Sequence, residues 1–178
     1  MKKIMLYTFE AILFVAALVG IDQYTKYYAA TTLKENGPVV LIKNVLELSY
    51  TENRGAAFGI LQNKQTFFFI IAVVFFIIAA FVFYRLPFIK KYLLFRILVL
   101  FIIAGGIGNM IDRTLNKYVV DFIFVKAINF PVFNVADCYV TISAVILAIL
   151  ILFVYKDDEL SGMFSIKRKM VADKDERV

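Results

Sequence analysis

The chain has 178 residues, 62% of them hydrophobic, and a mean hydropathy of +0.80. This apolar content, which includes 19 phenylalanines, exceeds what one small soluble core can bury and indicates a protein of the lipid bilayer. The net charge of +6 then reflects membrane topology and attraction to anionic lipid headgroups. Nucleic acid binding is excluded because no stacking aromatics are interspersed with the basic residues.

Four apolar runs are long enough to cross a bilayer, at residues 4–21, 67–84, 93–111 and 138–155. With a rise of 1.5 Å per residue, the shortest of them extends about 27 Å, close to the thickness of the hydrocarbon layer. The expected fold class is therefore a mainly α membrane protein with four transmembrane helices and a small β-rich element at the outer leaflet. We expect a single domain over residues 1–178. Lys2 and Lys3 precede the first run and no clear cleavage motif follows it, which predicts an uncleaved signal anchor.

The distribution of basic residues predicts the orientation in the membrane. With the N-terminus inside, the inner segments 1–3, 85–96 and 156–178 hold 12 of the 20 Lys and Arg, in 38 residues. The 67 outer residues, 22–65 and 112–134, hold the other 8. The positive-inside rule therefore predicts that both termini, including the polar tail 156–178, are cytoplasmic. Four aspartates at the ends of apolar runs or between them then lie on the outer side: Asp22, Asp112, Asp121 and Asp137.

The outer segments contain predicted strands. Residues 39–42 and 45–51 are separated by a turn at Lys43 and Asn44, and residues 118–125 are β-branched and aromatic. We expect outer β-rich segments over about 39–59 and 118–133. Asp121 is the only charge in the third strand, which is apolar on both faces. A lone carboxylate in such a strand indicates a functional site, because burying it without a partner or a purpose is costly.

The residue types exclude much chemistry. The chain contains no histidine, which removes Ser-His-Asp triads, Cys-His pairs and H-E-x-x-H zinc sites, and we expect neither a metal nor a cofactor. Cys138 is the single cysteine, and we expect it to pack in the fourth helix. Gly105, Gly106 and Gly108 are expected to let helices approach closely. Carboxylates remain for chemistry. Two close carboxylates share one proton, so the charged one can activate water while the neutral one donates a proton, which hydrolyses peptide bonds.

Two Asn and Asp pairs have the spacing that places both side chains on one helix face. Asn109 and Asp112 are three residues apart at the end of the third run, and Asn134 and Asp137 are three apart at the start of the fourth. For the second pair, a simpler interpretation is also open. Asn134 is a typical helix N-cap, and Asp137 would be a favourable acid in the first turn.

The other two aspartates also have structural interpretations. Asp22 lies four residues before Lys26, and Asp112 adjoins Arg113, so ion pairs that hold helix ends together are at least as well supported as catalysis. Three classes of protein thus remain open: a hydrolase, a small proton-coupled transporter or ion-conducting subunit, and an assembly subunit packed in lipid. The acids gather at one membrane face instead of marking a path across it, which disfavours a transporter. The assembly subunit leaves Asp121 unexplained.

Five motifs follow one another in the order of a known family. They are Asp22-Gln-Tyr-Thr-Lys26, Asn53-Arg-Gly55-Ala-Ala-Phe58, Gly105-Gly-Ile-Gly108-Asn109-Met-Ile-Asp112-Arg113, Val120-Asp121-Phe122 and Phe133-Asn134-Val-Ala-Asp137. Together they resemble the successive signature blocks of lipoprotein signal peptidase, also called signal peptidase II. The resemblance extends from residue 22 to about residue 145, with the four expected spans.

The resemblance implies an aspartic endopeptidase of the bacterial cytoplasmic (inner) membrane, with its active site near the outer leaflet. Its substrates would be prolipoproteins carrying a diacylglyceryl-modified cysteine, cleaved just before that cysteine. It would work as a monomer among membrane lipids, with no metal and no cofactor. By position, Asp121 and Asp137 match the catalytic pair. Polar residues that match positions lining the site are Asn53, Gly55, Asn109, Arg113 and Asn134, and structural or supporting ones are Asp22, Lys26 and Asp112.

Overall fold

The computed structural model describes residues 2–55, 65–87 and 89–156. Residues 56–59 of the expected β-rich segment and most of the polar tail lie outside the described residues. The helices are α1 (Lys2–Tyr28), α2 (Lys34–Asn36), α3 (Gln65–Arg85), α4 (Leu93–Leu115) and α5 (Val135–Ile149), and the strands are β1 (Val39–Ile42), β2 (Leu46–Asn53) and β3 (Val119–Val125). One π-helical turn, Ala29–Leu33, joins α1 to α2, and a second, Leu150–Val154, extends α5.

The helices confirm the predicted fold class. Three helical runs, Met5–Asn36, Lys90–Leu115 and Val135–Val154, are long and apolar enough to cross a membrane. The fourth apolar helix is α3, with 21 residues. Along these helices many large apolar side chains are exposed, which is the surface expected of a protein whose outer faces contact lipid.

The first helix continues well past the predicted boundary at Ile21. Its next turns carry Asp22 and Lys26, which are polar and therefore end the apolar run in the sequence. Both side chains are nevertheless buried against other elements. Hydropathy alone could not place the end of this helix, because the contacts that bury these charges come from α4 and α5.

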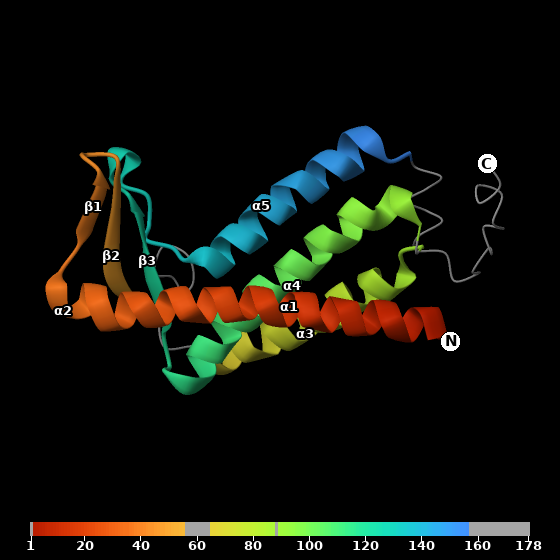
Figure 1. Cartoon of the computed structure of the whole chain (residues 1–178), viewed down its shortest axis with the longest axis horizontal. Coiled ribbons are helices and arrows are strands. Elements are labelled where there is room, and N and C mark those ends of the chain that lie inside the picture. The colour runs from red at the N-terminus through yellow and green to blue at the C-terminus, as the bar shows by residue number, and fades with distance from the viewer. Residues whose placement is uncertain (1, 56–64, 88, 157–178) are drawn as a thin grey trace.

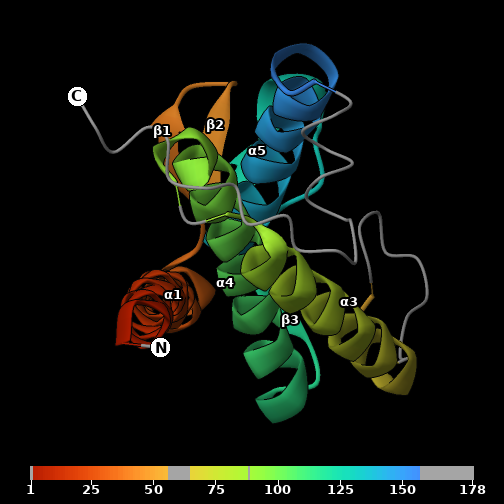
Figure 2. The same ribbon diagram turned by 90° about the vertical axis from the view of Figure 1, so that its right-hand side faces the viewer.

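Helix α4 lies at the centre of the bundle and packs against α1, α3 and α5 (Figure 2). Glycines allow this close packing, as the sequence predicted. A Cβ atom on Gly105 would overlap the backbone oxygen of Ala136 in α5, and one on Gly108 would overlap the carboxylate of Asp22 in α1. The polar residues near the end of α4 are thereby brought within hydrogen-bond distance of both neighbouring helices.

The strands form one antiparallel sheet in the order β1-β2-β3, at the end of the molecule away from the N-terminus (Figure 1). The three segments match the predicted strands within two residues, and Asn44 adopts a positive φ in the predicted turn. Val120 and Phe122 of β3 pack on Ala29 and Leu33, which follow α1. The sheet therefore rests on the end of the first helix, and β3 faces the start of α5.

Candidate active site

Asp121 lies in the middle of β3 and is 2% exposed. Two amide groups donate to its carboxylate: Asn134 Nδ2 to Oδ1 at 2.6 Å, and Asn53 Nδ2 to Oδ2 at 2.9 Å. Asn53 comes from the neighbouring strand β2, while Asn134 comes from the start of α5. The lone charge of the strand is thus satisfied by side chains that are far away in the sequence.

Asp137 and Asn134 form a capping box at the start of α5. Asn134 Oδ1 accepts from the backbone N–H of Asp137 at 3.0 Å, and Asp137 Oδ2 accepts from the backbone N–H of Asn134 at 3.2 Å. The N-cap interpretation of Asn134 is therefore confirmed. Asn134 can cap the helix and contact Asp121 at the same time, because its Oδ1 atom caps the helix while its Nδ2 atom donates to Asp121.

Asn109 links the two carboxylates from α4. Its Nδ2 donates to Asp137 Oδ1 at 2.8 Å, and its Oδ1 accepts from Asn134 Nδ2 at 3.2 Å. A continuous path of hydrogen bonds therefore leads from Asp121 through Asn134 and Asn109 to Asp137. This path joins the carboxylate of β3 to the carboxylate of α5.

Lys26 of α1 contacts this path of hydrogen bonds through Asn109 and also contacts two further aspartates. Its ammonium lies 2.9 Å from Asp22 Oδ2 and 3.2 Å from Asp112 Oδ2, and it donates to Asn109 Oδ1 at 2.9 Å. All three charged side chains are almost completely buried. The ion-pair interpretation of Asp22 and Asp112 is thus confirmed, although the cation that contacts Asp112 in these ion pairs is Lys26 and not its chain neighbour Arg113.

Lys26, Asp22 and Asp112 form a buried cluster. Each of its two aspartates also accepts a hydrogen bond from a backbone N–H group. Asp22 Oδ1 accepts from the N–H of Ala136 at 2.9 Å, and Asp112 Oδ2 accepts from the N–H of Val120 at 3.1 Å. Ala136 precedes Asp137, and Val120 precedes Asp121. The cluster therefore anchors the backbone immediately beside both members of the predicted catalytic pair.

Arg113 and Gly55 form the wall of the site next to the end of β2. Arg113 donates to the carbonyl oxygen of Gly55 at 3.1 Å, and the N–H of Gly55 donates to Asn53 Oδ1 at 3.0 Å. The predicted residues Asn53, Gly55 and Arg113 therefore lie together. Arg113 connects the end of α4 to the strand that carries Asn53.

A cavity of about 740 Å³ opens on these groups. Asp121, Asp137, Asn53, Asn109 and Arg113 all line it. The rest of the wall combines apolar side chains with a rim from β2; it includes Val119, Phe130, Pro131, Val132, Phe133, Ile142, Glu52 and Arg54. A polar patch in a mostly apolar cavity of this volume is typical of a ligand site. Cys138 lies in α5, as expected, and its half-buried side chain also lines the cavity.

Burial raises the pKa of Asp121 from an ordinary value of 3.8 to about 6, and the negative charge of Asp137 adds to the shift. Hydrogen bonds from Asn53 and Asn134 and the charge of Lys26 act in the opposite direction but do not cancel it. Two carboxylates whose charges repel in a shielded site favour a state with one shared proton.

Sequence reasoning missed two contributors. Gln23 donates to Asp22 Oδ2, to Asp112 Oδ1 and to the carbonyl oxygen of Gly108, each at 3.2 Å. Its position next to Asp22 in the first motif was the available signal. Arg54 lies at the cavity rim, where it donates to Glu52 at 2.9 Å and stacks over the ring of Tyr118. Its position between Asn53 and Gly55 in the second motif was the corresponding signal.

The fold and site define a class: a membrane protein of several apolar helices whose small sheet and helix ends build a cavity lined by two carboxylates. A family model described as signal peptidase (SPase) II matches residues 14–153. The chain belongs to the signal peptidase II family, as the motifs predicted. The family is one of peptidases, and it gives no support to the alternative of a transporter.

Relatives and solved structures agree with this assignment. The chain is 46% identical to a lipoprotein signal peptidase of Caldanaerobacter subterraneus subsp. tengcongensis, over 80% of this chain and 96% of that protein. It is 40% identical to one of Clostridioides difficile, over 80% and 94%. A solved bacterial membrane enzyme superposes with a TM-score of 0.70 at 38% identity, over 80% of this chain and 87% of that one.

Proposed function

We propose that this protein is an aspartic endopeptidase of the bacterial cytoplasmic membrane, with Asp121 and Asp137 as its catalytic pair. It removes signal peptides from diacylglyceryl-modified prolipoproteins, and it cleaves just before the lipidated cysteine. Family membership supports the peptidase activity and the prolipoprotein substrates. One observation carries the choice of residues: two acids from separate elements line the same cavity and are joined by Asn134 and Asn109.

The two acids take different roles because their surroundings differ. Asp121 is the more deeply buried, and its raised pKa makes it the member that holds the shared proton. Asp137, which is only half-buried, acts as the base, and Asn109 and the backbone N–H of Asn134 hold its carboxylate in place. The paired state therefore contains one proton donor and one general base, as acid-base hydrolysis requires.

In the first step, Asp137 accepts a proton from a water molecule, whose oxygen attacks the scissile carbonyl carbon. Asp121 donates its proton to the carbonyl oxygen, so a neutral tetrahedral intermediate forms. In the second step, Asp137 returns its proton to the leaving nitrogen as the C–N bond breaks. One hydroxyl of the intermediate gives its proton back to Asp121 while the new carboxyl group forms. The initial protonation state of both acids is thereby restored. Arg113, Asn109 and Asn134 orient the substrate and the acids throughout.

Topology and substrate delivery complete the proposal. Both termini are cytoplasmic and the active site lies near the outer leaflet, because the basic residues gather in the inner segments. The acyl chains of the substrate lie along the apolar outer ends of the helices, where each buried methylene contributes about 0.8 kcal/mol. The enzyme works as a monomer among membrane lipids.

Replacing either acid tests the proposal. Asp121→Asn and Asp137→Asn are each expected to lower the cleavage rate about 10²- to 10⁴-fold, because one proton-transfer step is lost. Purified variants are incubated with a lipidated precursor peptide, and the products are measured by mass spectrometry. Glu35→Gln changes an exposed acid of α2 and is the matched control. Circular dichroism and gel filtration verify the fold, and near-normal turnover by either Asn variant removes that residue from the pair.

A further inference from the structure

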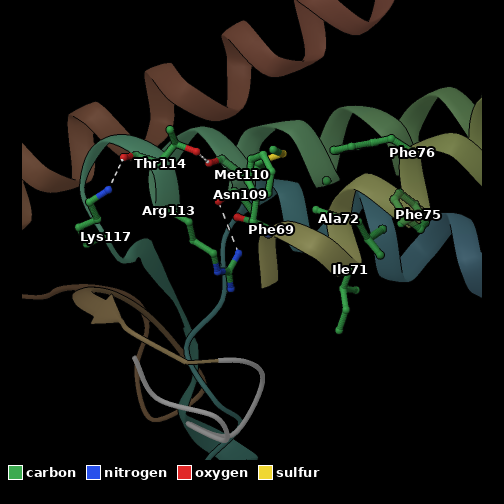
Figure 3. A pocket seen from close by; sticks show the side chains of 12 residues that line it. Phe69, Ile71, Ala72, Phe75, Phe76, Asn109, Met110, Arg113, Thr114 and Lys117 are labelled. Carbon is green, nitrogen blue, oxygen red and sulfur yellow. Dashed lines mark hydrogen bonds between the residues drawn. The ribbon is translucent and has the colours of Figure 1, made fainter. Parts of the chain in front are cut away.

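A second cavity, of about 550 Å³, lies between α3 and α4 (Figure 3). Phe69, Ala72 and Phe76 of α3 and Met110 of α4 are among the side chains that line it. Along α4 its lining runs from Gly106 to Thr114, which corresponds to about 12 Å of helix, and Lys117 follows just after the helix. The cavity is therefore long, mostly apolar, and parallel to a helix that crosses the membrane.

The cavity has a polar end and an apolar end. Thr114 and Lys117 lie at its outer end, where the Lys117 ammonium donates to the carbonyl oxygen of Thr114 at 3.1 Å. Phe75 and Phe76 form the deep end and contact one another edge to face. Gly106 allows this arrangement, since a Cβ atom there would meet the Phe76 ring at 3.0 Å. A polar mouth above an apolar groove matches the chemistry of a glycerolipid acyl chain.

The second cavity adjoins the first one and shares part of its lining with it. Asn109 and Arg113 line both cavities. Asn109 donates to Asp137, so the shared wall is one hydrogen bond away from the proposed general base. A ligand whose polar part lies beside the catalytic pair can therefore extend an apolar chain between α3 and α4.

We propose that this groove binds one acyl chain of the diacylglyceryl group of the substrate, an inference that rests on the proposed function. The glyceryl esters lie near Arg113, and the chain passes Met110 and Ala72 and ends against Phe75 and Phe76. The groove thereby measures chain length and holds the lipidated cysteine beside the catalytic pair. Lipid recognition and cleavage are coupled through the wall formed by Asn109 and Arg113.

Two substitutions change the groove in opposite directions without altering the catalytic pair. Ala72→Phe fills its middle, whereas Phe76→Ala extends its deep end. Ile77→Phe is the matched control, because Ile77 is exposed on the same helix and does not line the groove. Each full-length variant is assayed in phosphatidylcholine nanodiscs with precursor peptides that carry two hexanoyl, two palmitoyl or two stearoyl chains.

For Ala72→Phe, we expect KM to rise about tenfold or more with the palmitoyl substrate and to change little with the hexanoyl substrate. Phe76→Ala should keep both activities and accept stearoyl chains better than the wild type does. The same KM for all chain lengths in Ala72→Phe and the wild type would overturn the inference. An equal rise in KM for both substrates would overturn it too, because it indicates that a membrane phospholipid occupies the groove. Absence of cleavage by the wild type would instead contradict the proposed function.

Discussion

At the residue scale, the amide groups of the site are oriented by partners that can only donate. The backbone N–H of Gly55 donates to Asn53 Oδ1, the backbone N–H of Asp137 donates to Asn134 Oδ1, and Lys26 donates to Asn109 Oδ1. An amide whose oxygen is engaged in this way must turn its NH₂ group to the other side. In all three residues that NH₂ group donates to Asp121 or Asp137, the proposed catalytic pair.

The charge of Asp137 raises the pKa of Asp121. The substitution Asp137→Asn tests this effect. Burial and a neighbouring negative charge both favour the protonated acid, so Asp121 takes up a proton as the pH falls through about 6. The variant removes the repulsion but not the burial. We expect the pKa of Asp121 to fall yet to stay above 3.8, as measured by infrared titration of the carboxyl C=O band, with Asp121→Asn identifying that band. An unchanged or higher pKa would show that the two acids do not interact.

The cation of the buried cluster is tested by Lys26→Met. The substitution leaves Asp22 and Asp112 buried without their cation, which costs about 3 to 5 kcal/mol in comparable sites. We expect a clear loss of thermal stability by circular dichroism, and a lower kcat because Asn109 loses its orienting donor. Lys34→Met is the control, since Lys34 forms an exposed ion pair with Glu52 and should have little effect. Equal stability of the two variants would contradict the structural role of Lys26.

At the element scale, α4 positions the site because three elements pack around it. Its glycines bring α1 and α5 close enough for Lys26 to reach Asn109 and for Asn109 to reach Asp137. The sequence indicated close helix packing at these glycines. It did not indicate which helix each of them faces, because that depends on how the whole bundle is arranged.

Gly105→Ala tests this packing. Alanine normally favours a helix over glycine, but here the added methyl overlaps the carbonyl oxygen of Ala136, next to Asp137. We expect a loss of about 1 to 3 kcal/mol in stability, typical of overpacking, together with a lower cleavage rate. In contrast, Gly20→Ala adds its methyl in open space and should be neutral or slightly stabilising. Thermal unfolding of both variants provides the measurement, and a stabilised Gly105→Ala protein would argue against the close contact.

At the scale of the whole molecule, the sheet lies far from both the start of α1 and the end of α5. The start of α1 and the end of α5 lie at one end, and the strands lie at the other (Figure 1). This arrangement suits the proposed topology, in which both termini share one side of the membrane and the proposed catalytic cavity lies toward the other side. The distribution of basic residues predicts which side is cytoplasmic.

Cysteine labelling tests that orientation. In a Cys138→Ala background, Lys43→Cys places a thiol in the turn between β1 and β2, and Lys156→Cys places one after α5. A membrane-impermeant maleimide added to intact spheroplasts is expected to label the first variant only, and both after lysis. Labelling of Lys156→Cys in intact spheroplasts would reverse the orientation.

The sequence by itself determined that the protein lies in a lipid bilayer. It also determined the apolar helices, the three strand segments and the residue types of the site. These features follow from local composition and periodicity, since lipid contact and strand formation leave regular patterns along the chain. It also nominated four aspartates without separating two roles, and only the motif resemblance chose Asp121 and Asp137. Only the tertiary structure decided that Lys26 joins Asp22 to Asp112, that Asn134 and Asn109 connect the other two acids, and that a groove adjoins the catalytic cavity. Such contacts join residues from separate elements, and their energies depend on burial and distance, which no local pattern records.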